Sequence, residues 1–126
     1  MKNNKLFLDI LHDVVSDLDM TVTIIDQKDS FDYEFECWTS CGGDFVFDIV
    51  LNPEFEPIDF MKELLYFTDG FDPDYETYIW LDSDGHGKNG APYHIKDLLK
   101  DNEERLEILN NLYDTLQERF NEKLML

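Results

Sequence analysis

The stretch from Phe31 to Leu51, FDYEFECWTSCGGDFVFDIVL, decides the fold. Apolar and acidic residues alternate along 31–37, and apolar residues occupy every second position along 45–51. Because successive side chains of a strand point to opposite faces, each segment has one apolar face. A five-residue turn at 39–43 joins the two segments, so the stretch predicts an antiparallel β-hairpin.

The register that closes this turn places the apolar residues of both strands on one face. It pairs Cys37 with Phe45, Phe35 with Phe47, Tyr33 with Ile49 and Phe31 with Leu51. A shared apolar face is what specifies a strand register. The opposite face then carries acids and no basic residue, with Glu34 directly opposite Asp48 and Glu36 beside Val46.

This acidic face has two interpretations. Residues two apart on a strand are roughly 6.6 Å apart, twice the rise of about 3.3 Å per residue. That spacing is close to the distance between neighbouring phosphates of one nucleic-acid strand, so the face could imitate phosphates. A solvated acidic face also keeps a protein soluble and stops its sheet edge from pairing. For the hairpin alone, the second interpretation is favoured.

The charge of the whole chain favours the first interpretation. The 126 residues suffice for one domain, and the net charge is −19, from 29 acids and 10 bases. Small soluble domains need a net charge of only about 2 to 8. The excess is concentrated in residues 31–60, which contain eight acids and neither Lys nor Arg. Since self-repulsion destabilises a compact state, we expect the charge to serve an interaction with basic proteins or cations. Nucleic acid and anionic membranes should be repelled.

Composition also bounds the class of protein. Hydrophobic residues make up 43% of the chain and aromatic residues 14%, which excludes a disordered acidic tail. The start, MKNNKLFLDI, lacks the apolar region of a signal peptide, and no apolar run approaches the ~20 residues of a membrane span. Two cysteines are too few for a disulfide framework. We therefore expect a cytoplasmic protein with reduced thiols.

The segments that flank the hairpin predict two helices and one more strand. An apolar stripe predicts an N-terminal helix that ends near residue 18; it consists of Leu6, Ile10, Val14 and Leu18. The β-branched run Met20–Ile25 predicts a strand. A loop with two prolines at 52–57 precedes a short helix over 59–67.

The segment 71–81 is ambiguous. Asp72 and Pro73 could cap and begin a helix, but the alternation from Tyr75 onward favours a fourth strand. A glycine-rich loop follows at 82–92, and His94–Leu99 predicts at least one helical turn. A long final helix should begin at Asp101, capped with Glu104. Its apolar stripe is Leu106, Leu109, Tyr113, Leu116 and Phe120.

Together these elements predict a single α+β domain over residues 1–126. The antiparallel sheet should have three to four strands, with helices packed on one face and a long C-terminal helix. The other face should be the acidic one, open to solvent.

Metal sites are weakly indicated. The run 82–87, DSDGHG, resembles the start of a calcium loop, but Tyr93 stands where a closing glutamate is needed. Cys37 and Cys41 would need two further zinc ligands, such as His86 and His94. No residue is marked as catalytic and no phosphate-binding motif is present. We expect no enzyme activity, no metal and no cofactor.

Several segments resemble a group of small acidic proteins carried by phages and mobile elements of Gram-positive bacteria. They are YIWL at 78–81, GKNGAP at 87–92, IKDLLKD at 95–101, the leucine-spaced run 106–116 and CGGDFVFDI at 41–49. Proteins of this kind include anti-CRISPR and anti-restriction inhibitors, several of which imitate nucleic acid. The resemblance implies no catalytic residue.

We therefore expect a non-enzymatic inhibitor in the cytoplasm of a host bacterial cell. Its partner would be a basic nucleic-acid-binding protein, such as a CRISPR effector or a restriction enzyme. The expected partner-binding acids are Asp32, Glu34, Glu36, Asp44, Asp48, Glu54, Glu56, Asp72 and Asp74. Two alternatives remain open: a calcium- or zinc-binding domain, and a mobile-element accessory protein that binds its partner through Trp38, Tyr75 and Trp80.

Overall fold

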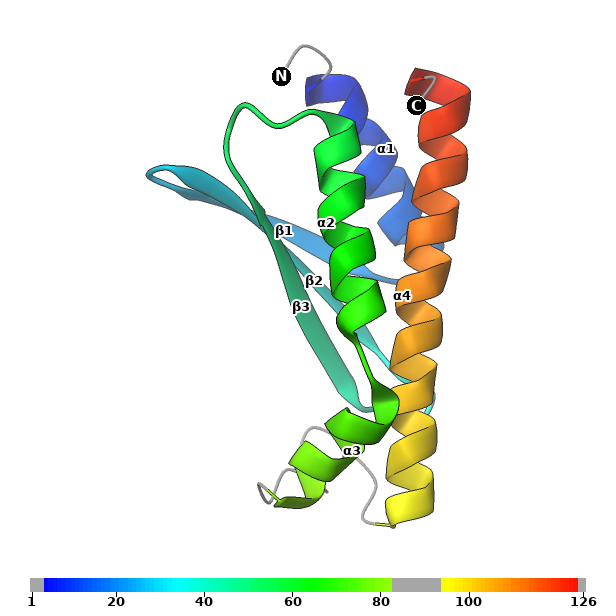
Figure 1. Ribbon diagram of the computed structural model, residues 1–126. Coiled ribbons are helices and arrows are strands. Elements are labelled where there is room, and N and C mark those ends of the chain that lie inside the picture. Colours follow the sequence, from blue (N-terminus) through cyan, green and yellow to red (C-terminus); the bar gives the residue numbers. More distant parts are fainter. Residues whose placement is uncertain (1–3, 83–93, 125–126) are drawn as a thin grey trace.

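A computed structural model describes residues 4–82 and 94–124 and confirms the α+β class (Figure 1). The elements in chain order are α1 (Asn4–Asp17), β1 (Thr21–Gln27), β2 (Ser30–Trp38), β3 (Asp44–Leu51), α2 (Pro57–Gly70), α3 (Pro73–Asp82) and α4 (Ile95–Leu124). The strands form one antiparallel sheet in the order β1-β2-β3. Helices α1, α2 and α4 lie on one side of this sheet, and α4 runs along the length of the molecule (Figure 1).

The predicted hairpin register is confirmed at every pair. Strand β2 pairs with β3 from Phe31 opposite Leu51 to Cys37 opposite Phe45, and Glu34 lies opposite Asp48. The other side of β2 pairs with β1, which places Thr23 opposite Glu34. The alternate apolar residues of β2 and β3 predicted to face inward are therefore on the face that the helices cover, and all except Phe31 are buried. Trp38, Val46 and Val50 are on the outer face and are about half exposed.

An aromatic cluster joins the sheet to the helices. The ring of Phe7 in α1 lies 6.1 Å from Tyr33, 5.2 Å from Phe55, 5.3 Å from Phe60 and 5.5 Å from Phe120, measured between ring centroids. Edge-to-face and offset-stacked pairs at these distances are the favoured aromatic arrangements. Since these rings come from α1, β2, the β3–α2 loop, α2 and α4, one core holds all the layers together.

The predicted fourth strand is wrong, because residues 73–82 form helix α3. The start of this helix follows the capping signal in the sequence: the Asp72 carboxylate accepts the N–H of Asp74 at 3.0 Å, and Pro73 is the first helical residue. Among residues 73–81 the helix buries only Thr77, while Tyr75 and Tyr78 remain exposed. Its apolar stripe is therefore too narrow to give a helical period in the sequence.

The predicted start of the last helix is also wrong. Helix α4 is continuous from Ile95 to Leu124, so the turn predicted from His94 and the helix predicted from Asp101 are one element. Asp101 does not cap a helix but forms an ion pair with Arg105 one turn later. Glu104 instead contacts Ser40 in the hairpin turn.

Helix α2 extends beyond its predicted limits at both ends. Pro57 is its first residue, where a missing N–H costs nothing, and the Asp59 carboxylate accepts the N–H of Glu56 at 2.9 Å. None of the helices in the described ranges has a stretch long and apolar enough to cross a bilayer.

Candidate functional site

The outer face of the sheet carries the five acids predicted from the hairpin. The pairing places Asp32, Glu34 and Glu36 along the central strand β2, with Asp44 and Asp48 on β3. The neighbours on β1 are Thr21, Thr23 and Ile25, and the remaining outer positions of β3 are Val46 and Val50. No Lys or Arg occupies an outward position on any of the three strands.

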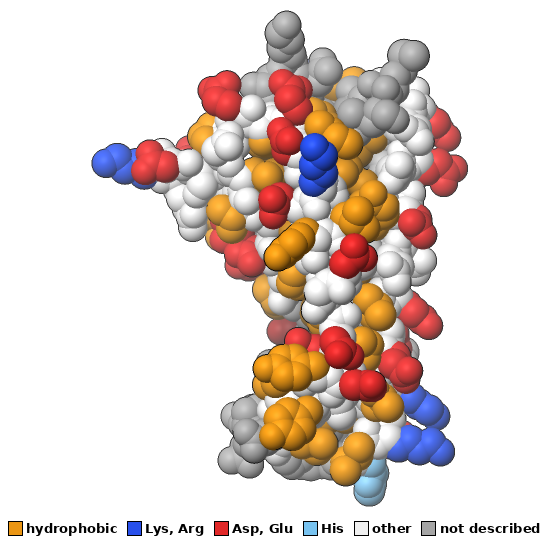
Figure 2. All heavy atoms as spheres, viewed as in Figure 1, with side chains coloured by type: hydrophobic (Ala, Val, Ile, Leu, Met, Phe, Trp, Pro, Cys, Tyr) orange, Lys and Arg blue, Asp and Glu red, His pale blue; other side chains and the backbone are white. Residues whose placement is uncertain are grey.

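Nothing in the described ranges neutralises these acids by an ion pair. The two ion pairs found in residues 4–82 and 94–124 join Arg105 to Asp101 and Arg119 to Asp17, so neither includes one of the five acids. In the view of Figure 2, basic side chains occupy small areas at the far end of the β1–β2 hairpin, on α2 and beside the first turns of α4. Within the described part of the chain, no ion pair therefore offsets the negative charge of the sheet face.

Two carboxyl pairs lie diagonally across β2 and β3. Burial raises the pKa of Asp32 above its ordinary value, and the neighbouring carboxyl groups of Asp48 and Glu34 raise it further. Burial likewise raises the pKa of Glu36, and the neighbouring carboxyl groups of Asp44 and Glu34 raise it further. Both pairs join residues one diagonal step apart in the register, within reach of their side chains.

Asp32 departs from the expected solvent exposure. Although it is on the outer face, only 9% of its surface is exposed, and its Oδ1 has no hydrogen-bond partner among the described residues. Asp44 Oδ1 is also buried and has no hydrogen-bond partner among the described residues. On this face, Glu34 and Asp48 are therefore exposed to solvent, whereas Asp32 is buried.

The other four predicted acids do not join this face. Glu54 and Glu56 belong to the loop between β3 and α2, at one end of the molecule, whereas Asp72 and Asp74 are at the start of α3, at the other end (Figure 1). Asp72 also has a local role, since its carboxylate caps α3. The structure therefore brings together five of the nine acids.

The metal-binding alternative rests mainly on residues outside the described ranges. The calcium-loop run, from its second residue onward, and His86 fall within 83–93. Within the described ranges, no three His, Cys, Asp or Glu side chains are grouped so as to hold a metal ion. Cys37 is buried, and burial raises the pKa of its thiol to about 11, although Arg105 acts in the opposite direction.

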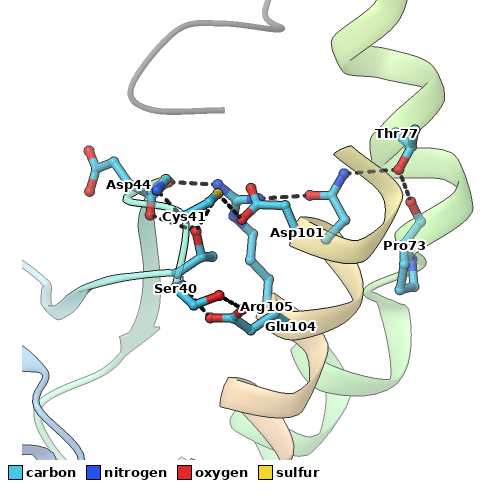
Figure 3. Close-up of polar contacts among 11 residues, drawn as sticks. Ser40, Cys41, Asp44, Pro73, Thr77, Asp101, Glu104 and Arg105 are labelled. Atoms are coloured by element: carbon cyan, nitrogen blue, oxygen red, sulfur yellow. Dashed lines mark hydrogen bonds and ion pairs between the residues drawn. The ribbon is translucent and has the colours of Figure 1, made fainter. Parts of the chain in front are cut away.

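A buried polar cluster around Arg105 was not predicted from the sequence (Figure 3). Arg105 forms the ion pair with Asp101, and both side chains are at most 4% exposed. Its guanidinium also donates to Asn102 Oδ1 and to the carbonyl of Asp44, each at 3.1 Å. Asn102 in turn donates to Thr77 Oγ1 at 3.0 Å, which links α4 to α3.

The same cluster anchors the hairpin turn to α4. Glu104 accepts the backbone N–H and the hydroxyl of Ser40, both at 2.6 Å, and the Cys41 thiol donates to Asp101 at 3.0 Å. Gly43 closes the turn against this cluster, where a Cβ atom would be 2.8 Å from Thr39 Oγ1. The cluster therefore holds the end of the acidic face in place. Its only sequence signal is the i, i+4 spacing of Asp101 and Arg105.

Two exposed tyrosines lie on α3, away from the acidic face, whereas the exposed Trp38 lies on that face opposite Asp44. Tyr75 and Tyr78 of α3 are 60% and 65% exposed, and Figure 2 shows hydrophobic side chains collected over α3. Of the three aromatic residues predicted for an accessory interaction, Trp38 and Tyr75 are exposed. Trp80 is half-buried, with its ring 5.7 Å from the Arg105 guanidinium carbon.

The comparisons with known proteins do not place the chain in a family. No protein-family model, no curated protein and no solved structure matches it.

Proposed function

We propose that this protein is a non-enzymatic inhibitor whose acidic sheet face occupies the basic nucleic-acid channel of a bacterial defence nuclease. A CRISPR effector or a restriction enzyme is the class of partner. One observation carries the proposal: five carboxyl groups share the outer face of the sheet, and no described Lys or Arg forms an ion pair with them.

The physical basis is competition for positive charge. Nucleic-acid channels derive much of their affinity from the neutralisation of phosphates by Lys and Arg. Along β2, alternate acids are roughly 6.6 Å apart, at twice the strand rise. A guanidinium or ammonium group that approached the diagonal carboxyl pairs would stabilise their ionised forms and relieve their repulsion. In the described part of the folded protein, no Lys or Arg forms an ion pair with these carboxyl groups.

The exposed tyrosines of α3 support a second candidate, an accessory protein that binds its partner by apolar contact. The two candidates differ in their response to salt. Contacts between exposed charges weaken as ionic strength rises, whereas apolar contacts do not.

The test is displacement of DNA from a purified nuclease. Complexes of a CRISPR effector or a restriction enzyme with fluorescent target DNA are titrated with the protein at about 50 mM and about 200 mM salt. We expect the DNA and the protein to exclude each other from the nuclease. The affinity of the nuclease for the protein should be about tenfold or more weaker at the higher salt. A ternary complex that retains the DNA, or an affinity unchanged by salt, would contradict the proposal for that nuclease.

A further inference from the structure

Strand β3 is at an edge of the sheet. It pairs with β2 on one side, and no strand in the described ranges pairs with its other side. An edge strand presents unpaired main-chain N–H and C=O groups, which form a template for another strand.

The hydrogen-bond pattern identifies which groups point outward. The N–H of Thr39 donates to the carbonyl of Gly43 at 2.8 Å, so these two residues form a hydrogen-bonded pair. Because such pairs alternate in an antiparallel ladder, Phe45 uses its main-chain groups toward β2, as does every second residue after it. The main-chain groups of Val46, Asp48 and Val50 then point to the free edge.

An independent contact agrees with this alternation. Asp44 belongs to the same outward set, and its carbonyl accepts a hydrogen bond from Arg105 at 3.1 Å, on the side away from β2. The first outward carbonyl of β3, that of Asp44, is thus already hydrogen-bonded to Arg105. The edge that remains free begins at Val46, which leaves room for a short added strand.

A groove runs beside this edge. It has a volume of about 520 Å³ and lies between β3, α2 and the start of α3. Its apolar wall includes Tyr66, Phe67 and Phe71, and its acids are Asp48, Glu63 and Glu76. No Lys or Arg is among the described residues that line it.

We propose that an extended basic segment of a partner protein adds to β3 as a further strand. Its main chain would bond to Val46, Asp48 and Val50, its apolar side chains would enter the groove against Tyr66, and alternate Lys or Arg side chains would meet Asp48. This inference goes beyond the proposed function, because it depends on main-chain pairing at the edge rather than on the charge of the open face.

The chemistry of the edge favours a basic segment over a second copy of this chain. A second β3 would bring its own Asp44 and Asp48 to the same edge, and opposed like charges destabilise a strand pair. Each copy also carries a net charge of −19, which adds repulsion at longer range. A basic extended segment would be attracted rather than repelled, both by the acids at the edge and by the net charge of the chain.

The test uses two blocked peptides of identical charge, acetyl-KVKVKVK-amide and the same peptide N-methylated at every residue. Full N-methylation removes every main-chain donor and prevents pairing with β3 in either strand direction, while it leaves the electrostatic attraction intact. We expect the unmodified peptide to bind about tenfold or more tightly, a difference of about 1.4 kcal/mol. Amide chemical shifts should change at Val46, Asp48 and Val50.

Two variants of exposed residues complete the test. Tyr66→Ala removes a side chain that is 81% exposed in the groove and should weaken binding of the unmodified peptide severalfold, whereas Tyr78→Ala on α3 should not. Equal binding of the two peptides would overturn the proposal. Amides of Val46, Asp48 and Val50 that are already protected from hydrogen exchange in the free protein, and do not respond to peptide, would also overturn it. Such protection would show that another part of the chain or a second copy covers the edge.

Discussion

Glu34 and Asp48 lie directly opposite each other on the outer face of the sheet. Like charges in this position destabilise a strand pair, and an opposite charge is the favoured neighbour. Diagonal carboxyl pairs flank them on both sides, formed by Asp32 with Asp48 and by Glu36 with Asp44. The face therefore concentrates repulsion that the hairpin must overcome through its buried aromatic side.

The carboxyl pairs predict a pH dependence of stability. A raised pKa in the folded state means that folding favours the protonated form, so this stabilisation is complete below the ordinary carboxyl pKa and is lost as pH rises through the raised value. The double variant Asp32→Asn/Glu36→Gln should lose less stability than the parent between about pH 4 and neutrality. Its stability relative to the parent should therefore increase as the pH rises toward 7.

Urea unfolding at a series of pH values measures this difference. The control is Asp9→Asn/Glu118→Gln, which makes the same change in charge at exposed helical positions. A stability difference between the parent and the sheet-face variant that is the same at every pH would contradict the assignment of raised pKa values to this face.

The buried ion pair of Arg105 predicts a large loss of stability on truncation. Arg105→Met should reduce the free energy of unfolding by about 3 kcal/mol or more, because it leaves Asp101 buried without its partner. Arg119→Met removes the exposed pair with Asp17 and should cost at most about 1 kcal/mol. Chemical denaturation of both variants checks the contrast, and equal losses would show that the Arg105 cluster does not anchor the turn.

The close packing around Gly43 predicts that a methyl group is not tolerated there. A Cβ atom would lie 2.9 Å from Arg105 Nη2 and 3.0 Å from Asp101 Oδ2, so Gly43→Ala must displace buried groups. We expect a loss of about 1 to 3 kcal/mol. At Gly70, the last residue of α2, a Cβ atom would have no neighbour within 4 Å among the described residues, so Gly70→Ala should be neutral or slightly stabilising. Thermal unfolding distinguishes the two, and a neutral Gly43→Ala would contradict this close packing.

The hairpin could be predicted from the sequence because its information is local. An alternating pattern and a turn of known length leave one register that gathers the apolar residues, and that register is the observed one. The outer acids Asp32, Glu34 and Glu36 follow directly from it. What did not follow was the burial of Asp32, since this depends on the side chains that surround it.

Helix α3 and the Arg105 cluster were missed because they depend on contacts distant in the sequence. Among residues 73–81 only Thr77 is buried, so the apolar pattern of this helix carries no clear period, and packing against α4 decides the outcome. The bond between Ser40 and Glu104 spans 64 residues. From the sequence alone, Asp101 and Glu104 were interpreted as a capping pair at the start of a helix. That interpretation was wrong, because Glu104 bonds to Ser40 and Asp101 pairs with Arg105.

The central claim is that the position of the acids on the sheet face, rather than the total charge of the chain, determines inhibition. The direct measurement compares two triple variants with the parent in the DNA-displacement assay at one ionic strength. One variant changes the face, Glu34→Gln/Glu36→Gln/Asp48→Asn, and the other makes the same charge change on the helices, Asp9→Asn/Glu118→Gln/Glu122→Gln. The account predicts that the face variant inhibits about tenfold or more weakly and that the helix variant inhibits like the parent. A face variant that still folds and inhibits as well as the helix variant would contradict it.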